Sequence, residues 1–306
     1  MKILNRVLTG AVVAVIFYFL IRHLVTNWGK IPFSELRFDV GYLAISFLFL
    51  LAYFLLLTIG WSQIVGELDS KIPFQKALYI MATSQIAKYL PGGIWYTLGR
   101  VYLGKSARIK EEIGLLSVVF ETFLLMLTNL VIFLVAINFI SSEPVLSPWL
   151  SILFIVVILV LLYPPLLNML LNLALRLFKR PRVMLKAKYA NILKLSAYFF
   201  GVWLCQIAGF YTLINSIFPI PLTQLAHLAA AYTLSWITGF IVLFAPGGLG
   251  VREGMMSLLL APILPSPLAV VISFISRIWI TLFETVMFFV GLGIRKRTST
   301  RNNLDS

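Results

Sequence analysis

The chain has 306 residues, of which 60% are hydrophobic and only 12% are charged, and its formal net charge is +14. No ordinary soluble core needs so apolar a composition. Uncharged stretches long enough to cross a bilayer, for which about 20 apolar residues suffice, recur at 40–66, 195–218 and 222–251. The composition therefore excludes a soluble protein and predicts an all-α polytopic membrane protein. Alternating strands that would indicate a transmembrane barrel are absent from the sequence.

Taken in chain order, six segments are predicted to span the membrane completely: 7–27, 40–66, 113–140, 149–175, 195–218 and 267–294. Pro164 and Pro165 interrupt the fourth of these segments. Arg22 and His23 are expected near an end of the first, where an interfacial role is favoured for the histidine. The lone Cys205 lies in an apolar run and is interpreted as a small buried residue.

Two further segments carry the same short sequence at a break. Pro91-Gly92-Gly93 separates 73–90 from 94–105, and Pro246-Gly247-Gly248 separates 222–244 from 251–264. Proline removes a backbone donor and glycine permits positive φ, so both triplets break a helix. Broken backbone at membrane depth survives only where protein buries it or water reaches it. We therefore predict two re-entrant hairpins with Pro-Gly-Gly at their tips.

Positive charge sets the orientation. Residues 176–194 hold seven Lys and Arg and no acid, and the tail after 294 is also basic, whereas 141–148 and 219–223 hold no Lys or Arg. Cytoplasmic loops are enriched in Lys and Arg. Both termini are therefore predicted to be cytoplasmic in a multi-pass protein of the cell membrane.

The predicted topology contains the same three-part unit twice, in opposite orientation. Within a single transmembrane domain, 1–306, the first repeat covers about 40–140 and the second about 195–294, with 141–194 as a connecting helix and basic loop. Phe120-Glu121-Thr122 and Phe283-Glu284-Thr285 occupy matching places in the two units. Inverted repeats with broken helices meeting near the midplane are common in transporters.

Ionisable residues inside apolar helices are costly and suggest function. Glu121 and Glu284 are such residues, and Arg277 lies on the same helix face as Glu284, seven positions earlier. We expect these three residues to act in gating or proton coupling. The alternative is a structural ion pair with an arginine of a hairpin.

Arg100 and Arg252 follow the two tips, and arginine suits bidentate phosphate recognition, aided by the free N–H groups of a helix N-terminus. For Arg252 the alternative is pairing with Glu253 or Glu284. Lys88 is interpreted as near the cavity or essential to it. Trp95, Trp236 and Trp279 pack, sit at interfaces or stack on a sugar. The candidate substrate-binding residues are Lys88, Pro91, Gly92, Gly93, Arg100, Pro246, Gly247, Gly248, Arg252 and Glu253.

Signatures of catalysis are absent from the sequence: it has no Walker loop, no His-Glu-x-x-His, no Cys/His cluster and no Gly-x-Ser-x-Gly elbow. We therefore expect no enzymatic activity, no metal and no cofactor. Nucleic-acid binding is not expected, because no soluble basic domain accompanies the positive charge.

The Pro-Gly-Gly-x-x-x-x-x-Gly-Arg sequence at 91–100 and the Pro-Gly-Gly-Leu-Gly-Val-Arg-Glu-Gly sequence at 246–254 resemble the lysylphosphatidylglycerol synthase transmembrane family, a flippase-like domain, over nearly the whole chain. The resemblance implies eight membrane segments and movement of lipids between leaflets, with links to polyprenyl-phosphate glycan, hopanoid and glycolipid pathways. The aminoacyl-transferase domain of fused members has no counterpart in these 306 residues, so synthesis of lysyl-lipid is not expected.

The leading hypothesis is a lipid flippase-like transporter that moves an anionic or glycosylated headgroup between leaflets. Its partners would be membrane lipids, anionic or polyprenyl-phosphate-linked; a partner glycosyltransferase or lipid-synthesis enzyme, and a homo-oligomer, are compatible with the sequence. The alternatives are a membrane glycosyltransferase or accessory subunit, and a secondary transporter of a small anion.

Overall fold

The computed structural model describes residues 18, 21–22, 25–26, 29, 33–34, 36–68, 70–90, 94–140, 147–177, 179–242 and 246–304. Within these residues every regular element is a helix and no strand occurs, as predicted. The predicted first span, 7–27, lies largely outside the described residues, and His23 lies wholly outside them.

Among the described residues, four helices are long and apolar enough to cross a bilayer. They are α2 (Val40–Glu67), α5 (Glu111–Ile137), α8 (Tyr189–Asn215) and α11 (Ser266–Leu304), and they correspond to four of the predicted spans. The 28 residues of α2 extend about 42 Å, more than the hydrocarbon thickness of about 30 Å. The helix α8 begins six residues before the predicted start at 195, and α11 continues ten residues past 294. The basic residues near the start of α8 and the end of α11 do not break a helix, so the sequence did not mark where these two helices begin and end.

The predicted fourth span is a bent pair of helices. The helices α6 (Pro148–Leu161) and α7 (Pro164–Leu177) meet at an angle of 73°. Pro164 and Pro165 lack the N–H groups needed to continue α6, so the predicted interruption is confirmed. With this pair counted as one span, the described residues hold five candidate spans, and the predicted count of six is not confirmed.

Two pairs of short helices flank the Pro-Gly-Gly triplets. The first pair is α3 (Phe74–Gln85), extended by the 3₁₀ turn η2 (Ile86–Tyr89), and α4 (Trp95–Gly104). The second is α9 (Leu225–Ile241) and α10 (Val251–Leu260), with η5 (Pro246–Gly248) between them. In each pair the two helices pack against one another as the arms of a hairpin would, and the re-entrant path through a membrane stays a prediction. Residues 91–93, the first tip, lie outside the described residues.

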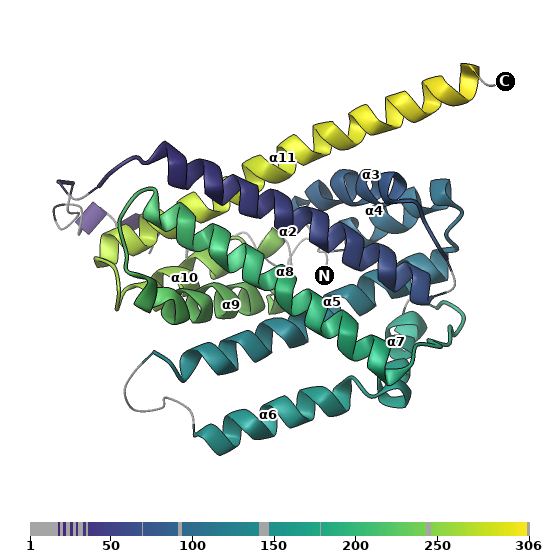
Figure 1. Cartoon of the computed structure of the whole chain (residues 1–306), viewed down its shortest axis with the longest axis horizontal. Helices are drawn as coiled ribbons and strands as arrows, with labels where there is room; N and C mark the ends of the chain where they lie inside the picture. Colours follow the sequence, from purple (N-terminus) through teal and green to yellow (C-terminus); the bar gives the residue numbers. More distant parts are fainter. Residues whose placement is uncertain are drawn as a thin grey trace.

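Each helix pair packs against both α5 and α11. The helix α3 packs along α11 and α4 along α5, while α9 packs along α5 and α10 along α11. The helices α2 and α8 lie side by side across the molecule and form its most extensive contact (Figure 1). The two pairs therefore make matching contacts, and the inverted repeat stays a prediction.

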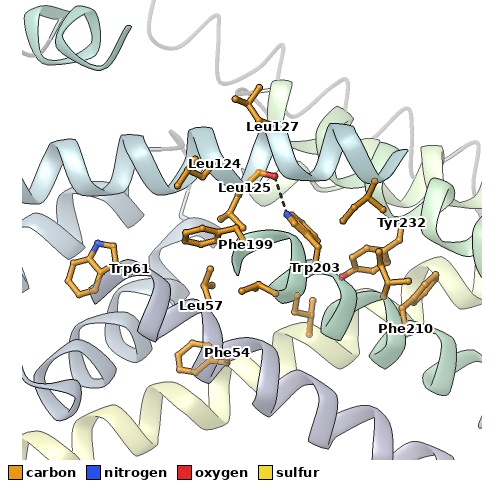
Figure 2. Close-up of a cluster of buried hydrophobic side chains, with 14 of the residues drawn as sticks. Phe54, Leu57, Trp61, Leu124, Leu125, Leu127, Phe199, Trp203, Phe210 and Tyr232 are labelled. Carbon is orange, nitrogen blue, oxygen red and sulfur yellow. Dashed lines mark hydrogen bonds between the residues drawn. The ribbon is translucent and has the colours of Figure 1, made fainter. Parts of the chain in front are cut away.

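The buried core draws on most of the described helices, and one part of it lies between α2, α5 and α8. Figure 2 shows Phe54 and Leu57 of α2 facing Phe199 and Trp203 of α8. The indole Nε1 of Trp203 donates to the carbonyl oxygen of Leu125 on α5, at 3.0 Å. Large side chains with one polar tip fill a core well when that tip finds a backbone acceptor. This contact fixes α8 against α5.

The basic connecting segment is held in place by two asparagines of α7. Asn172 binds both the N–H and the carbonyl of Val183, at 3.0 and 2.9 Å, and Asn168 does the same for Leu185, at 2.8 and 3.1 Å. A side-chain amide that accepts from the N–H and donates to the carbonyl of one residue satisfies both backbone groups, as a neighbouring strand would. The segment is therefore extended, with Leu185 buried and Arg182 exposed.

The close contact of α2 with α8 generates the first prediction. A Cβ at Gly60 would lie 2.8 Å from Cζ of Phe199, whereas a Cβ at Gly66 of the same helix would meet nothing within 4 Å. Gly60→Leu should lower the free energy of unfolding by about 1–3 kcal/mol through overpacking. The thermal midpoint in detergent measures this effect, and an equal loss in Gly66→Leu would contradict it.

Candidate functional site

The candidate site is a cavity of about 190 Å³ where the two helix pairs meet. Residues of both pairs and of α2, α5 and α11 line it. They include Tyr53, Leu57, Gln85, Lys88, Tyr96, Glu121, Thr122, Leu125, Trp236, Gly239, Phe240, Val242, Gly247, Gly248, Arg252, Arg277 and Glu284. A cavity with five acidic or basic side chains is unusual inside so apolar a bundle, which makes it the candidate functional site.

One arm of the first helix pair is held by Glu284 of α11. The Lys88 ammonium forms an ion pair with Oε1 of Glu284. The Tyr89 hydroxyl donates to Oε2 of the same carboxylate at 2.8 Å and lies 3.0 Å from Oγ1 of Thr281. The adjacent residues Lys88 and Tyr89 therefore bind the same carboxylate, that of Glu284, which lies about 195 positions later in the sequence.

The other arm of this pair is held by Glu121 of α5. The Arg100 guanidinium and the Tyr96 hydroxyl, at 3.1 Å, both donate to Oε2 of Glu121. The guanidinium carbon also lies 4.5 Å from the Tyr96 ring centroid and 5.1 Å from that of Trp61. The side chains of Arg100 and Glu121 are 0% and 1% exposed. Arg100 is thus enclosed by two aromatic rings and a carboxylate, while its Nε and Nη2 find no hydrogen-bond partner among the described residues.

The two matched Phe-Glu-Thr carboxylates consequently hold the same hairpin. Each binds one tyrosine hydroxyl and one cation, Glu284 on the arm before the first tip and Glu121 on the arm after it. Part of the predicted alternative is therefore observed, because Glu121 forms an ion pair with a hairpin arginine. Glu284 pairs with Lys88, a residue that sequence reasoning placed near the cavity.

The second tip is fixed through its backbone. Gly247 has φ 58°, and its carbonyl oxygen accepts from Nη2 of Arg277 at 2.6 Å. The N–H of Gly250 donates to Oε2 of Glu253 at 2.6 Å, which caps the start of α10. The other oxygen of Glu253 lies 3.6 Å from Nε of Arg277. Glu253 and Arg277 therefore hold the turn in shape from both sides.

Arg252 is the one cation of the cavity for which the described residues supply no carboxylate partner. Its Nη2 donates to the Tyr232 hydroxyl at 2.8 Å, and Gln206 Nε2 donates to the same hydroxyl at 2.6 Å. The residue is 9% exposed. Neither predicted alternative, pairing with Glu253 or with Glu284, is observed. The buried guanidinium of Arg252 is thus held by a phenol hydroxyl rather than by a carboxylate of the described residues.

The residues beside the two breaks lie together. A Cβ at Gly247 would lie 3.5 Å from the Tyr89 ring and 3.6 Å from the carbonyl oxygen of Lys88. The guanidinium carbon of Arg277 lies 5.3 Å from the centroid of the same ring. Residues beside both predicted breaks therefore line one cavity, Lys88 before the first and Gly247 and Gly248 in the second.

The site residues predicted from the sequence do not all lie at the cavity. Seven line the cavity: Lys88, Glu121, Gly247, Gly248, Arg252, Arg277 and Glu284. Arg100 and Glu253 lie behind the lining, where they pair with Glu121 and Arg277. Pro91, Gly92, Gly93 and the side chain of Pro246 lie outside the described residues. The binding and gating roles of all these residues stay predictions.

Sequence reasoning missed the tyrosines. Tyr53, Tyr96 and Tyr232 lie in or against the cavity, and Tyr89 and Tyr96 bind the two carboxylates. A usable signal existed only for Tyr96, which precedes Arg100 by four residues and so shares its helix face. The other tyrosines carry no local pattern that separates them from packing residues.

The three tryptophans considered from the sequence differ in setting. Trp236 lines the cavity and stacks on Phe240, with ring centroids 5.4 Å apart and planes 8° apart. Trp279 is buried and donates from Nε1 to Oγ of Ser46 at 3.1 Å, which favours a packing role. Trp95 is 46% exposed. Among the described residues no group of His, Cys, Asp or Glu could hold a metal ion.

The tight second tip yields a prediction about stability. A Cβ at Gly248, where φ is 74°, would lie 2.7 Å from the carbonyl oxygen of Gly239. Gly248→Ala should therefore lower the free energy of unfolding by about 2 kcal/mol or more, through backbone strain and the clash. Thermal unfolding in detergent checks this. Gly201→Ala, where the added Cβ would meet nothing within 4 Å, is the control; a similar midpoint for both variants would refute the argument.

Comparison with known protein families identifies the family of this chain. The sequence profile described as "Lysylphosphatidylglycerol synthase TM region" matches residues 6–287, nearly the whole chain. A search of curated protein sequences gave no match. The matched region contains both Pro-Gly-Gly triplets and both Phe-Glu-Thr triplets. Together with the long apolar helices, it identifies a multi-pass membrane protein with a function connected with membrane lipids. The chain belongs to the lysylphosphatidylglycerol synthase TM region family.

Proposed function

We propose that the protein is a lipid flippase-like transporter that moves an anionic or glycosylated lipid headgroup between the leaflets of the cell membrane. The observation that carries this proposal is the cavity where the two broken helix pairs meet, with Lys88, Arg252 and Arg277 in its lining. Such cations attract a phosphate, while the surrounding apolar helices leave acyl chains in lipid. The protein binds and moves the lipid without altering it covalently.

The repeat supplies a route across the membrane. In this proposal the units 40–140 and 195–294 are inverted repeats, and their helix pairs are re-entrant hairpins that enter from opposite sides. The matching contacts of the two pairs, α3 on α11 and α4 on α5 against α9 on α5 and α10 on α11, support it. Rocking one repeat against the other would then expose the same cavity to each leaflet in turn. Both termini lie in the cytoplasm, on the side of the basic 176–194 segment.

The partners follow from the same chemistry. The ligands are membrane lipids with an anionic or polyprenyl-phosphate-linked headgroup. An enzyme of lipid or glycolipid synthesis would supply or consume the translocated lipid. With no nucleotide motif in the sequence, the driving force would be an ion gradient or that consumption.

Translocation in proteoliposomes tests the proposal. Protein reconstituted with phosphatidylglycerol carrying a headgroup fluorophore should make the inner-leaflet label accessible to dithionite faster than empty liposomes do. Arg252→Ala should reduce that rate about tenfold or more, since losing one charge-assisted phosphate contact costs about 1.5–3 kcal/mol. Glu284→Gln should also slow it.

The matched control is Arg182→Ala, which removes an exposed arginine of the connecting segment, outside the cavity lining. Its rate should equal that of the unaltered protein. Equal rates for protein, variants and empty liposomes would refute the transport function.

A further inference from the structure

The charges in and behind the cavity do not balance. Its lining and the groups paired with the lining hold four cations, Lys88, Arg100, Arg252 and Arg277, against three carboxylates, Glu121, Glu253 and Glu284. The cluster therefore carries one excess positive charge. Arg252 holds that excess, because its polar contact is with the neutral Tyr232 hydroxyl. An uncompensated buried charge is costly, and one bound anion would compensate it.

The three ion pairs of the cluster are not equally closed. The side chains of Arg100 and Glu121 are at most 1% exposed, and those of Arg277 and Glu253 are 11% and 2% exposed. In the third pair the Lys88 side chain is 29% exposed. Lys88 and Arg277 both line the cavity, whereas Arg100 does not. Arg277 is less exposed and is also held by the carbonyl of Gly247, so Lys88–Glu284 is the most open of the three pairs to an incoming anion.

The contacts of the two matched glutamates, Glu121 and Glu284, also indicate that the Lys88–Glu284 pair is the more accessible one. Glu121 binds groups of α4 and lies against a guanidinium enclosed by two rings. Glu284 instead binds a lysine at the end of the other arm, directly beside the second tip. A lysine ammonium is a compact charge on a flexible stem and exchanges partners more readily than a stacked guanidinium does. The chain thus contains a fixed pair and an exchangeable pair at corresponding positions of its repeat.

We propose that Glu284 is a built-in competitor for the headgroup phosphate: the phosphate replaces Glu284 on Lys88 and binds Arg252 at the same time. The Glu284 carboxylate occupies Lys88 whenever no phosphate is present, so Lys88 is never left as a second uncompensated cation. When the carboxylate returns to Lys88 it displaces the phosphate, which promotes release on the far side of the membrane. This inference rests on the proposed function only in taking the phosphate to be part of a lipid.

The excess charge also defines the class of ligand. A phosphodiester carries one negative charge and brings the cluster to neutrality. A phosphate monoester, with up to two charges, leaves the cluster negative with Glu284 displaced nearby. The cavity therefore favours a phosphodiester-linked headgroup over a terminal phosphate, and it gives a sugar headgroup without phosphate no means of displacing Glu284.

Binding to the purified full-length protein in detergent tests the exchange separately from transport. Phosphatidylglycerol is titrated, and bound lipid is counted by native mass spectrometry. Glu284→Gln should bind it about tenfold more tightly, within the usual range for competition coupled through one site. Lys88→Gln should bind it more weakly. The double variant should match Lys88→Gln, because Glu284 acts only by occupying Lys88.

The control for charge alone is Glu111→Gln. Glu111 pairs with Lys105 and Arg180 at 2.5 Å, on an exposed surface outside the cavity. It should leave the affinity unchanged. Unchanged or weaker binding by Glu284→Gln would overturn the proposal. So would a tenfold gain that persists in the double variant, because Glu284 would then act independently of Lys88.

Binding of three further ligands shows which part of the proposal is wrong if the expected result is not observed. Phosphatidic acid should gain less from Glu284→Gln than phosphatidylglycerol does, and a diacylglycerol glucoside should gain nothing; an equal gain for the glucoside would overturn the role of phosphate. Glycerophosphoglycerol, the same phosphodiester without acyl chains, should bind weakly in every variant. An equal gain for it would support the exchange and overturn the lipid as its source. A normal exchange in a protein that fails to translocate lipid would refute the proposed function alone.

Discussion

Buried charges in an apolar helical bundle must find partners within the protein, and this constraint organises the structure. Removing an ion from water costs several kcal/mol even after relaxation. Glu121 and Glu284 find such partners in the two arms of the first hairpin, where they form ion pairs with Arg100 and Lys88. Arg277 meets this constraint by holding the carbonyl of Gly247 in the second tip. The ion pairs therefore hold broken backbone in place at the centre of the molecule, where water cannot do so.

The same constraint links the fold to the proposed transport. The first hairpin is held by side-chain contacts to α5 and α11, whereas the second tip is fixed through its backbone. Side-chain ion pairs can exchange partners, but a capped glycine turn has few alternatives. A ligand that competes for one ion pair would loosen one hairpin while the other stays rigid. Exchange at Lys88 would thus couple headgroup binding to movement between the two units.

Local sequence was sufficient for the helices. The stretch 40–66 is uncharged, and Asp39 caps it by accepting from the N–H of Tyr42 at 3.0 Å, so α2 appears within one residue of its predicted bounds. The prolines at 164 and 165 broke the fourth span as expected, but their angle of 73° depends on packing against α5 and was not predictable. The ends of α8 and α11 were misplaced because charged residues continue these helices beyond the apolar stretch.

The sequence by itself determined the class, the two breaks and the matched Phe-Glu-Thr triplets, since apolar length, proline, glycine and repeated motifs are local properties. It also identified seven of the residues that line the cavity. Only the tertiary structure decided which charges pair. Glu284 pairs with Lys88, 196 positions away, while Arg252 meets the hydroxyl of Tyr232 and no carboxylate of the described residues. The reason is physical: an ion pair depends on which helices pack together, and the packing of both helix pairs against α5 and α11 brings together groups that no sequence spacing relates.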